Sequence, residues 1–185
     1  MPTGPNDAAI VARILAGDTE AFGLLVDRYE PDLARYARWA LGNEDEAADA
    51  VQDALVRAYR SLHRCSDPER FKGWLFRIVS NRCKTHLARH RRRRTERLED
   101  LPAEPELDQG DPGGDAERRD RTEQLERALE ELSPEHREAL VLRYVNDMSV
   151  PEMADALDLS VSAVKMRLHR GREALRTVLQ PEGGG

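Results

Sequence analysis

The chain has 185 residues and a formal net charge of −6, which allows one domain of ordinary size or two small ones. Its two cysteines exclude a disulfide-stapled secreted domain, and no apolar run is long enough for a secretion signal or a membrane span. We therefore expect a cytoplasmic protein without membrane insertion.

Apolar residues recur at three- and four-residue spacing through the N-terminal half, which predicts helices and almost no strand. The first helix ends at Gly17-Asp18. The second runs from Phe22 to Ala40 and contains Pro31, which marks a kink or a new helix start. A third is predicted from about Glu44 to Leu62, with acidic residues in its first turn, as the helix dipole favours.

A polar loop over residues 63–69 precedes a basic helix of roughly Phe71 to Arg92. From Arg70 to Thr95 there are ten Lys or Arg and no Asp or Glu. Large apolar residues are interleaved with these cations: Phe71, Trp74, Phe76, Ile78, Val79 and Leu87. The mixture suits a nucleic-acid backbone with exposed bases. A solvated basic face is the alternative, and a second DNA-reading feature near the C-terminus decides against it.

Residues 95–120 form a predicted flexible linker. The stretch 96–124 holds eleven acidic and four basic residues among several Pro and Gly, with no apolar periodicity. Such a segment buries too little surface to offset its ordering entropy. The predicted fold class is therefore all-α, with two small helical domains, 1–94 and 121–180, joined by a flexible acidic linker.

Start signals divide the C-terminal domain into short helices. Ser133-Pro134 supplies an N-cap followed by proline at the first helical position, and Ser149 with Glu152 matches a capping box. A tight turn, Asp158-Leu159-Ser160, then leads into a longer helix ending near Leu179. Two helices joined by so short a turn predict a helix-turn-helix, with a plain helical hairpin as the alternative.

The last helix has the two faces expected of a recognition helix. Val161, Val164, Leu168, Gly171 and Leu175 share one face by the 3.6-residue period. The other face is polar and cationic, which suits the major groove. We assign base readout to Ser162, Lys165, Met166, His169 and Arg170, and phosphate contacts to Arg167, Arg172 and Arg176.

Taken together, the chain resembles a bacterial RNA polymerase sigma factor of the extracytoplasmic-function (ECF) group. Four stretches carry the resemblance: Gly17 to Phe22 followed by Tyr29; Ala48 to Leu55; Trp74 to Asn81; and Leu132-Ser133-Pro134 through Glu152-Met153-Ala154 to Val164–Arg170. Their order, with a linker between the third and the fourth, makes the match specific.

The resemblance implies three binding surfaces. Asp49, Gln52, Asp53 and Leu55 would contact the clamp helices of the largest subunit of core RNA polymerase, although simple helix solubility also explains these acids. The loop before the basic helix and the helix itself would capture the minus-ten non-template strand through Arg70, Lys72, Arg77, Asn81 and Lys84. Trp74 would serve as core or wedge support there, and Arg91 to Arg94 would contact phosphates.

The helix-turn-helix would read the minus-thirty-five element of promoter DNA. The resemblance also implies an anti-sigma factor as a regulatory partner, and a linker that either threads a cationic polymerase channel or keeps the basic helix from a self-inhibiting contact. The chain departs from the family pattern at Thr85, Asp158, Ser162-Ala163 and Gly171. These departures bear on which promoter sequence is read.

Two other classes of function fit less well. We expect no enzyme, because no phosphate loop, nucleophile triad or supported carboxylate pair is present. Cys83, His86 and His90 lie along one helical face, near His63 and Cys65, but their cationic helix disfavours a dication, so we expect no metal and no cofactor. A transcription regulator acting without polymerase would explain the helix-turn-helix alone.

Overall fold

The computed structural model describes residues 5–96, 124–125 and 127–179, and gives side chains up to residue 89 in the first of these ranges. Every regular element in them is helical, as predicted. The N-terminal group comprises α1 (Asp7–Leu15), α2 (Phe22–Leu41), α3 (Glu44–Arg60) and α4 (Phe71–Glu96), and the C-terminal group contains α6 (Pro134–Tyr144), α7 (Val150–Leu157) and α8 (Val161–Leu179). The predicted linker beyond Glu96 and the side chains of Arg91 to Arg94 lie outside what is described. No described helix is long and apolar enough to cross a membrane.

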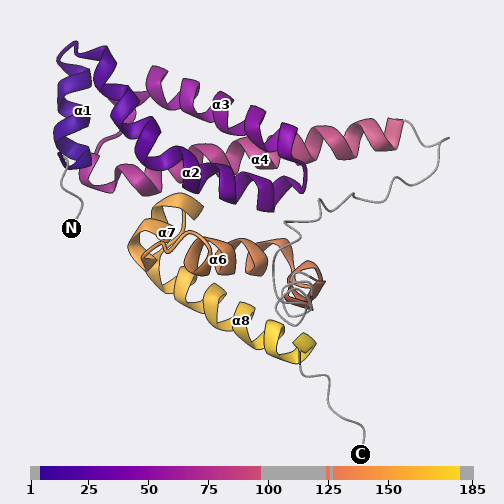
Figure 1. Ribbon diagram of the computed structural model, residues 1–185. Helices are drawn as coiled ribbons and strands as arrows, with labels where there is room; N and C mark the ends of the chain where they lie inside the picture. Colours follow the sequence, from indigo (N-terminus) through magenta and orange to yellow (C-terminus); the bar gives the residue numbers. More distant parts are fainter. Residues whose placement is uncertain (1–4, 97–123, 126, 180–185) are drawn as a thin grey trace, which may run out of the picture.

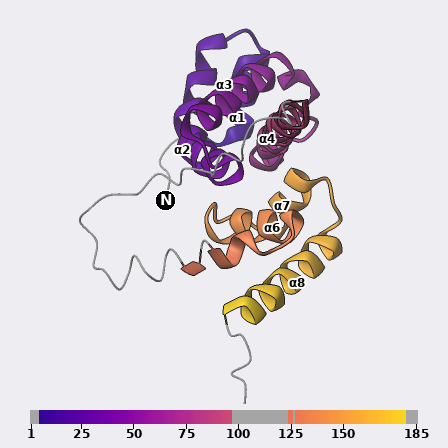
Figure 2. The same cartoon turned by 90° about the vertical axis from the view of Figure 1, so that its right-hand side faces the viewer.

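The two groups of helices are stacked against each other (Figure 1). α7 packs against α4, and α6 packs against α2. A view turned by 90° shows α6 and α7 between the N-terminal helices and α8 (Figure 2). The sequence predicted two tethered domains but not this direct contact, which decides what each surface can reach.

Buried residues explain why α2 does not break at Pro31. The helix continues through the proline as one 20-residue element, so the predicted second start does not occur. Leu25 and Tyr29 before Pro31 and Leu33 and Tyr36 after it are all buried on the same face. Burying these side chains on both sides outweighs the roughly 3 kcal/mol that proline costs inside a helix.

Small residues let α3 lie close to its neighbours. Its buried face is mostly alanine: Ala47, Ala50, Ala54 and Ala58, with Val51. Aromatic residues of α4 fill the space opposite, with Phe71 and Phe76 fully buried. Tyr36 of α2 meets Phe76 edge to face with ring centroids 6.0 Å apart. Leu87, predicted to pack with this group, is instead exposed.

Cap chemistry sets the helix-turn-helix as predicted. Asp158 ends α7 in the left-handed region at φ 56°, and the amide of Ala163 donates to the Ser160 hydroxyl at the start of α8. Val164 and Leu168 are buried, and a Cβ on Gly171 would lie 3.3 Å from the His136 carbonyl oxygen of α6. The prediction was wrong for Val161, which is 41% exposed because it sits at the open first turn of α8.

The capping box of α7 gives a test of stability. The Ser149 amide donates to Glu152 Oε2 at 2.6 Å, and the Glu152 amide donates back to Ser149 Oγ at 3.4 Å. We expect Ser149→Ala to lower the free energy of unfolding by about 1 kcal/mol in urea denaturation, because it removes the cap. Ser162→Ala, a serine in the first turn of α8 without a capping role, should change it by less than about 0.5 kcal/mol. Equal losses in both variants would contradict the cap assignment.

Candidate nucleic-acid interface

A strongly basic pocket lies between α3 and α4. It has a volume of about 560 Å³, and its lining includes five arginines: Arg57, Arg60, Arg64, Arg77 and Arg82. The only acid among the lining residues is Asp53. Trp74, Ile78 and Asn81 complete the wall on α4. Cations around an aromatic ring and a side-chain amide suit a single strand, whose phosphates and unstacked bases need these two kinds of contact.

Of the residues assigned to strand capture, Trp74, Arg77 and Asn81 meet at this pocket. Asn81 is exposed, and Trp74 is half-buried with its ring centroid 5.7 Å from that of Phe71. Trp74 therefore both supports the core and faces the pocket. The arginines of α3 were missed, because their spacing reads as an ordinary solvated helix end and only the packing of α3 on α4 brings them to Asn81.

A second row of α4 residues faces the C-terminal helices. Arg70, Gly73, Arg77, Ser80 and Lys84 follow a three- and four-residue spacing, which places them along one side of the helix. Arg70 Nη2 lies 2.5 Å from Asp155 Oδ1, and Lys84 Nζ lies 3.2 Å from Glu138 Oε1. We call this row the α4 basic stripe. Arg77 belongs to both the stripe and the pocket.

Glu138 of α6 is the most enclosed acid at this contact, with a side chain 12% exposed. Its Oε1 accepts hydrogen bonds from the Tyr36 hydroxyl at 2.8 Å and the Ser80 hydroxyl at 2.6 Å. Burial, with the neighbouring Glu138 carboxylate, raises the pKa of Tyr36 well above its ordinary value. The phenol therefore keeps its proton and stays a donor.

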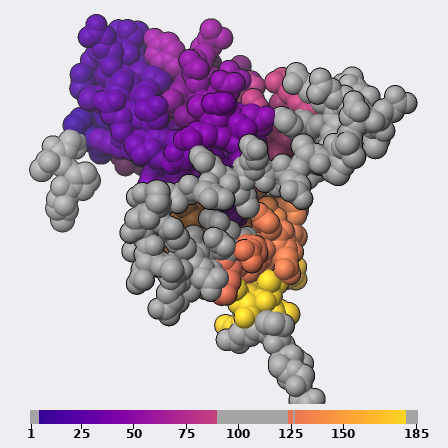
Figure 3. Space-filling view, turned by 45° about the vertical axis from the view of Figure 1, so that its right-hand side comes forward, coloured from indigo at the N-terminus to yellow at the C-terminus, as the bar shows by residue number. Residues whose placement is uncertain are grey.

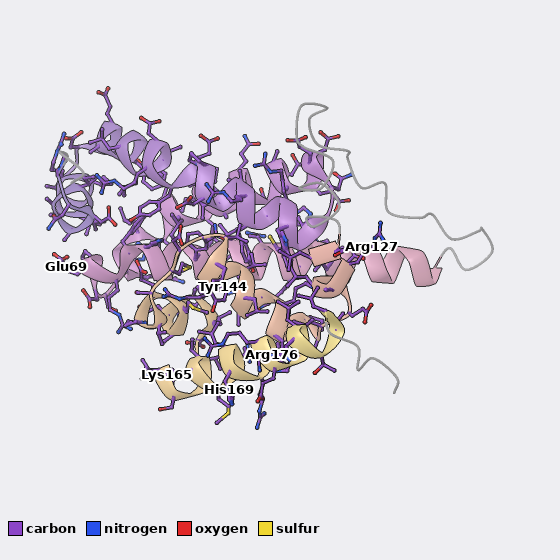
Figure 4. All side chains as sticks on the ribbon, turned by 60° about the horizontal axis from the view of Figure 1, so that its bottom comes forward. Glu69, Arg127, Tyr144, Lys165, His169 and Arg176 are labelled. Carbon is purple, nitrogen blue, oxygen red and sulfur yellow. The ribbon has the colours of Figure 1, made fainter. Side chains whose placement is uncertain are left out.

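The outer face of α8 is open to solvent. Exposed residues on it are Ser162, Lys165, Met166, His169, Arg170 and Arg172. Lys165, His169 and Arg176 lie along α8 at the edge of the molecule (Figure 4), and α8 lies at the far end from the N-terminal helices in the space-filling view (Figure 3). Arg167 differs, since its guanidinium is 3.2 Å from Glu135 of α6 and its side chain is largely covered. That pairing holds α8 on α6 and leaves Arg167 less free to reach DNA.

The residues assigned to the polymerase interface lie on the side of α3 away from the core. Asp49, Gln52 and Asp53 are exposed, whereas Leu55 is half-buried and packs against the core. Asp53 also borders the basic pocket. The surface is thus acidic at its centre and basic at its C-terminal end.

The cysteines have no chemistry of a metal or redox site. Both are buried and unpaired, and the described residues contain no group of three or more His, Cys, Asp or Glu able to hold a metal. Burial, aided by Glu138, raises the pKa of Cys83 to about 12.

This pKa predicts an unreactive thiol. With a pKa raised to about 12, Cys83 is protonated at pH 8, and the thiolate is the reacting form. In a Cys65→Ala background, we expect slow reaction of the native protein with an aromatic disulfide reagent and fast reaction in denaturant. Rapid native reaction would show that Cys83 is accessible and ionised.

Comparison with known proteins agrees with this geometry. The family of sigma-70 region 2 matches residues 25–93, and that of sigma-70 region 4 matches residues 122–175. The chain is 32% identical to the RNA polymerase sigma-H factor of Pseudomonas aeruginosa, covering 98% of this chain and 97% of the relative. It is also 32% identical to the ECF RNA polymerase sigma-E factor of Escherichia coli K12, covering 95% of each.

Among solved structures, CnrH in complex with the cytosolic domain of CnrY is similar, with a TM-score of 0.69 and 32% identity. The similarity covers 96% of this chain and 99% of CnrH. With both sigma-70 regions matched in order and relatives aligned nearly end to end, the chain belongs to the ECF group of RNA polymerase sigma factors.

Proposed function

We propose that this sigma factor acts in the cytoplasm on core RNA polymerase, with a separate task for each surface. The exposed acids of α3 contact the polymerase, the pocket between α3 and α4 captures the non-template strand of the minus-ten element, and the outer face of α8 reads the minus-thirty-five element. Residues 1–94 and 121–180 are the two working domains. The observation that carries the proposal is the pocket itself, where Trp74 and Asn81 stand among five arginines.

The energetics of strand opening support this use of the pocket. Each base-pair step of DNA costs about 1.4 kcal/mol to unstack. Stacking of a base on an aromatic ring returns about 1–3 kcal/mol, and cations along the backbone add to this. A half-buried Trp74 beside the exposed Asn81 amide offers one ring edge and one hydrogen-bonding group to a base. The surrounding guanidiniums, which need no particular base, would hold the phosphates.

The exposure of the α8 face supports duplex reading in the major groove. Its polar residues at the N-terminal half are where recognition helices contact base edges. Met166 is 50% exposed, which is unusual for a large apolar residue and suits contact with a thymine methyl. Arg170 and Arg172 are exposed and would reach phosphates or bases on either side.

A protein regulator fits the same family reasoning. The similar CnrH structure is of a complex with the cytosolic domain of CnrY. We propose that an anti-sigma factor likewise holds this chain inactive. The exposed apolar residues Leu24 and Tyr59 on the N-terminal helices offer a starting surface for it.

The test is transcription by purified core polymerase supplied with this protein on genomic fragments, with start sites mapped. We expect Asn81→Ala to slow strand opening, read by permanganate reactivity of thymines, while duplex affinity changes little. Lys165→Ala should instead weaken promoter binding and lower the slope of log affinity against log salt by about 0.9, as for one lost phosphate contact. Arg38→Ala, an exposed arginine paired with Glu44 away from both surfaces, is the control for lost charge. Failure of the wild-type protein to start defined transcripts would refute the proposal.

The polymerase surface makes a separate prediction. We expect Asp49→Lys to weaken binding to core polymerase about tenfold, because an exposed acid at a charged interface becomes repulsive. Asp45→Lys, the same change in the first turn of α3, should have a smaller effect. Affinity measured with labelled protein and core enzyme distinguishes them, and equal effects would mean that α3 contacts the polymerase through another face.

A further inference from the structure

Four cations assigned to minus-ten contacts are all engaged by acids of the C-terminal helices. Arg70 pairs with Asp155 at 2.5 Å, Lys84 with Glu138 at 3.2 Å, and Arg77 with Asp158 at 3.2 Å. Lys72 lies 3.9 Å from Glu152. These acids come from α6, from α7 and from the residue that ends α7. One domain thus presents its negative charges to the cations with which the other would hold DNA.

Glu138 shows how closely a carboxylate takes the place of a phosphate. Its Oε1 receives hydrogen bonds from two hydroxyls, of Tyr36 and Ser80, and lies beside the Lys84 ammonium. Hydroxyl donors and a cation around one anionic oxygen are the same contacts that DNA-binding proteins make to backbone phosphates. The α4 basic stripe and its neighbouring donors therefore form an anion-binding surface, occupied here by the chain itself.

Gly73 shows that the contact is close and specific. A Cβ at this position would lie 2.6 Å from Asp155 Cβ and 2.8 Å from the Glu152 carbonyl oxygen. These are the atoms nearest to it, and both belong to α7. Glycine lowers the stability of a helix by about 1 kcal/mol relative to alanine, so within the N-terminal domain alone Ala would be favoured. The glycine is needed for α7 to approach α4.

Further polar contacts hold α6 and its C-terminal end against α2. The Asn146 side-chain amide donates to the Asp32 carbonyl oxygen at 2.8 Å, and Arg35 donates to the Val145 carbonyl oxygen at 2.8 Å. Arg137 lies over the Trp39 ring at 5.8 Å. The acids on the stripe are therefore carried by a docked domain and not by a loosely touching loop.

We propose that the C-terminal domain is an intramolecular competitor of the promoter strand, closing over the α4 basic stripe until polymerase or DNA separates the two domains. The idea rests on the proposed function, because it concerns the same minus-ten cations. In the closed form the outer face of α8 and the exposed acids of α3 stay accessible. Polymerase and the minus-thirty-five duplex can therefore bind before the strand-capturing surface is released.

The strength of the closure is limited by exposure. Asp158 is largely solvated and Arg70 and Lys84 are half-exposed, so each pair is weak and screened by salt. Closure relies on several such pairs together with the fit at Gly73. The closed form then reduces apparent affinity for single strands by the fraction of molecules that are open.

The first test uses full-length Gly73→Ala. We expect an increase in the radius of gyration by small-angle scattering and about tenfold tighter binding of a fluorescein-labelled single-stranded oligonucleotide of about 12 thymidines. Gly23→Ala is the matched control, since it is also a helical glycine and its added Cβ would meet nothing within 4 Å. It should scatter and bind like the wild type.

A second pair of variants changes charge without adding bulk. Glu138→Gln with Asp155→Asn should also open the protein and tighten oligonucleotide binding by several fold. Glu20→Gln with Glu30→Gln removes the same charge from exposed sites on the N-terminal helices and controls for the general effect of net charge. Thermal unfolding followed by circular dichroism identifies any variant that has merely unfolded.

The outcomes separate this idea from the proposed function. If both test variants scatter like the wild type, or if they open without binding the oligonucleotide more tightly, the competitor role is overturned. Opening with tighter binding supports it, even if the wild type starts no transcripts with core polymerase. In that case the proposed function fails and the competition for single strands stands.

Discussion

The close approach of α7 to α4 at Gly73 is the constraint on which the arrangement of charges depends. Because no side chain stands between the two backbones there, Glu152 and Asp155 come within reach of Lys72 and Arg70. The same docking brings α6 over Tyr36 and Ser80, so that Glu138 is enclosed by donors from two helices. A larger residue at position 73 would separate all of these partners at once.

Segregation of charge explains how an acidic protein can bind DNA at two sites. The region from residue 125 onwards carries a net charge of −3, yet its acids Glu138, Glu152 and Asp155 face the N-terminal domain while Lys165 and Arg170 face outward on α8. Fields are local at physiological salt, since screening acts over about 8 Å. A DNA duplex at α8 therefore meets the cations and not the acids.

Much of the local structure could be predicted from sequence, because caps and periodicity act over a few residues. Ser133-Pro134, the Ser149–Glu152 capping box and Asp158 each mark an element boundary that the structure has. Pro31 was harder, since its effect depends on how much surface the flanking residues bury. The all-α fold and the helix-turn-helix followed from these signals, whereas the course of residues 97–123 stays a prediction.

The site was less predictable, for a physical reason. A cation's partner is set by which helices pack together, and that lies beyond the reach of local spacing. The regular spacing of Arg70, Gly73, Arg77, Ser80 and Lys84 was visible, but a row of cations with a glycine reads equally well as a DNA-binding face or a helix-packing face. The structure indicates that the two readings are compatible, because acids and phosphates make the same demands on a cationic surface. A helix that must bind a polyanion only at the right moment can be covered beforehand by carboxylates of its own chain.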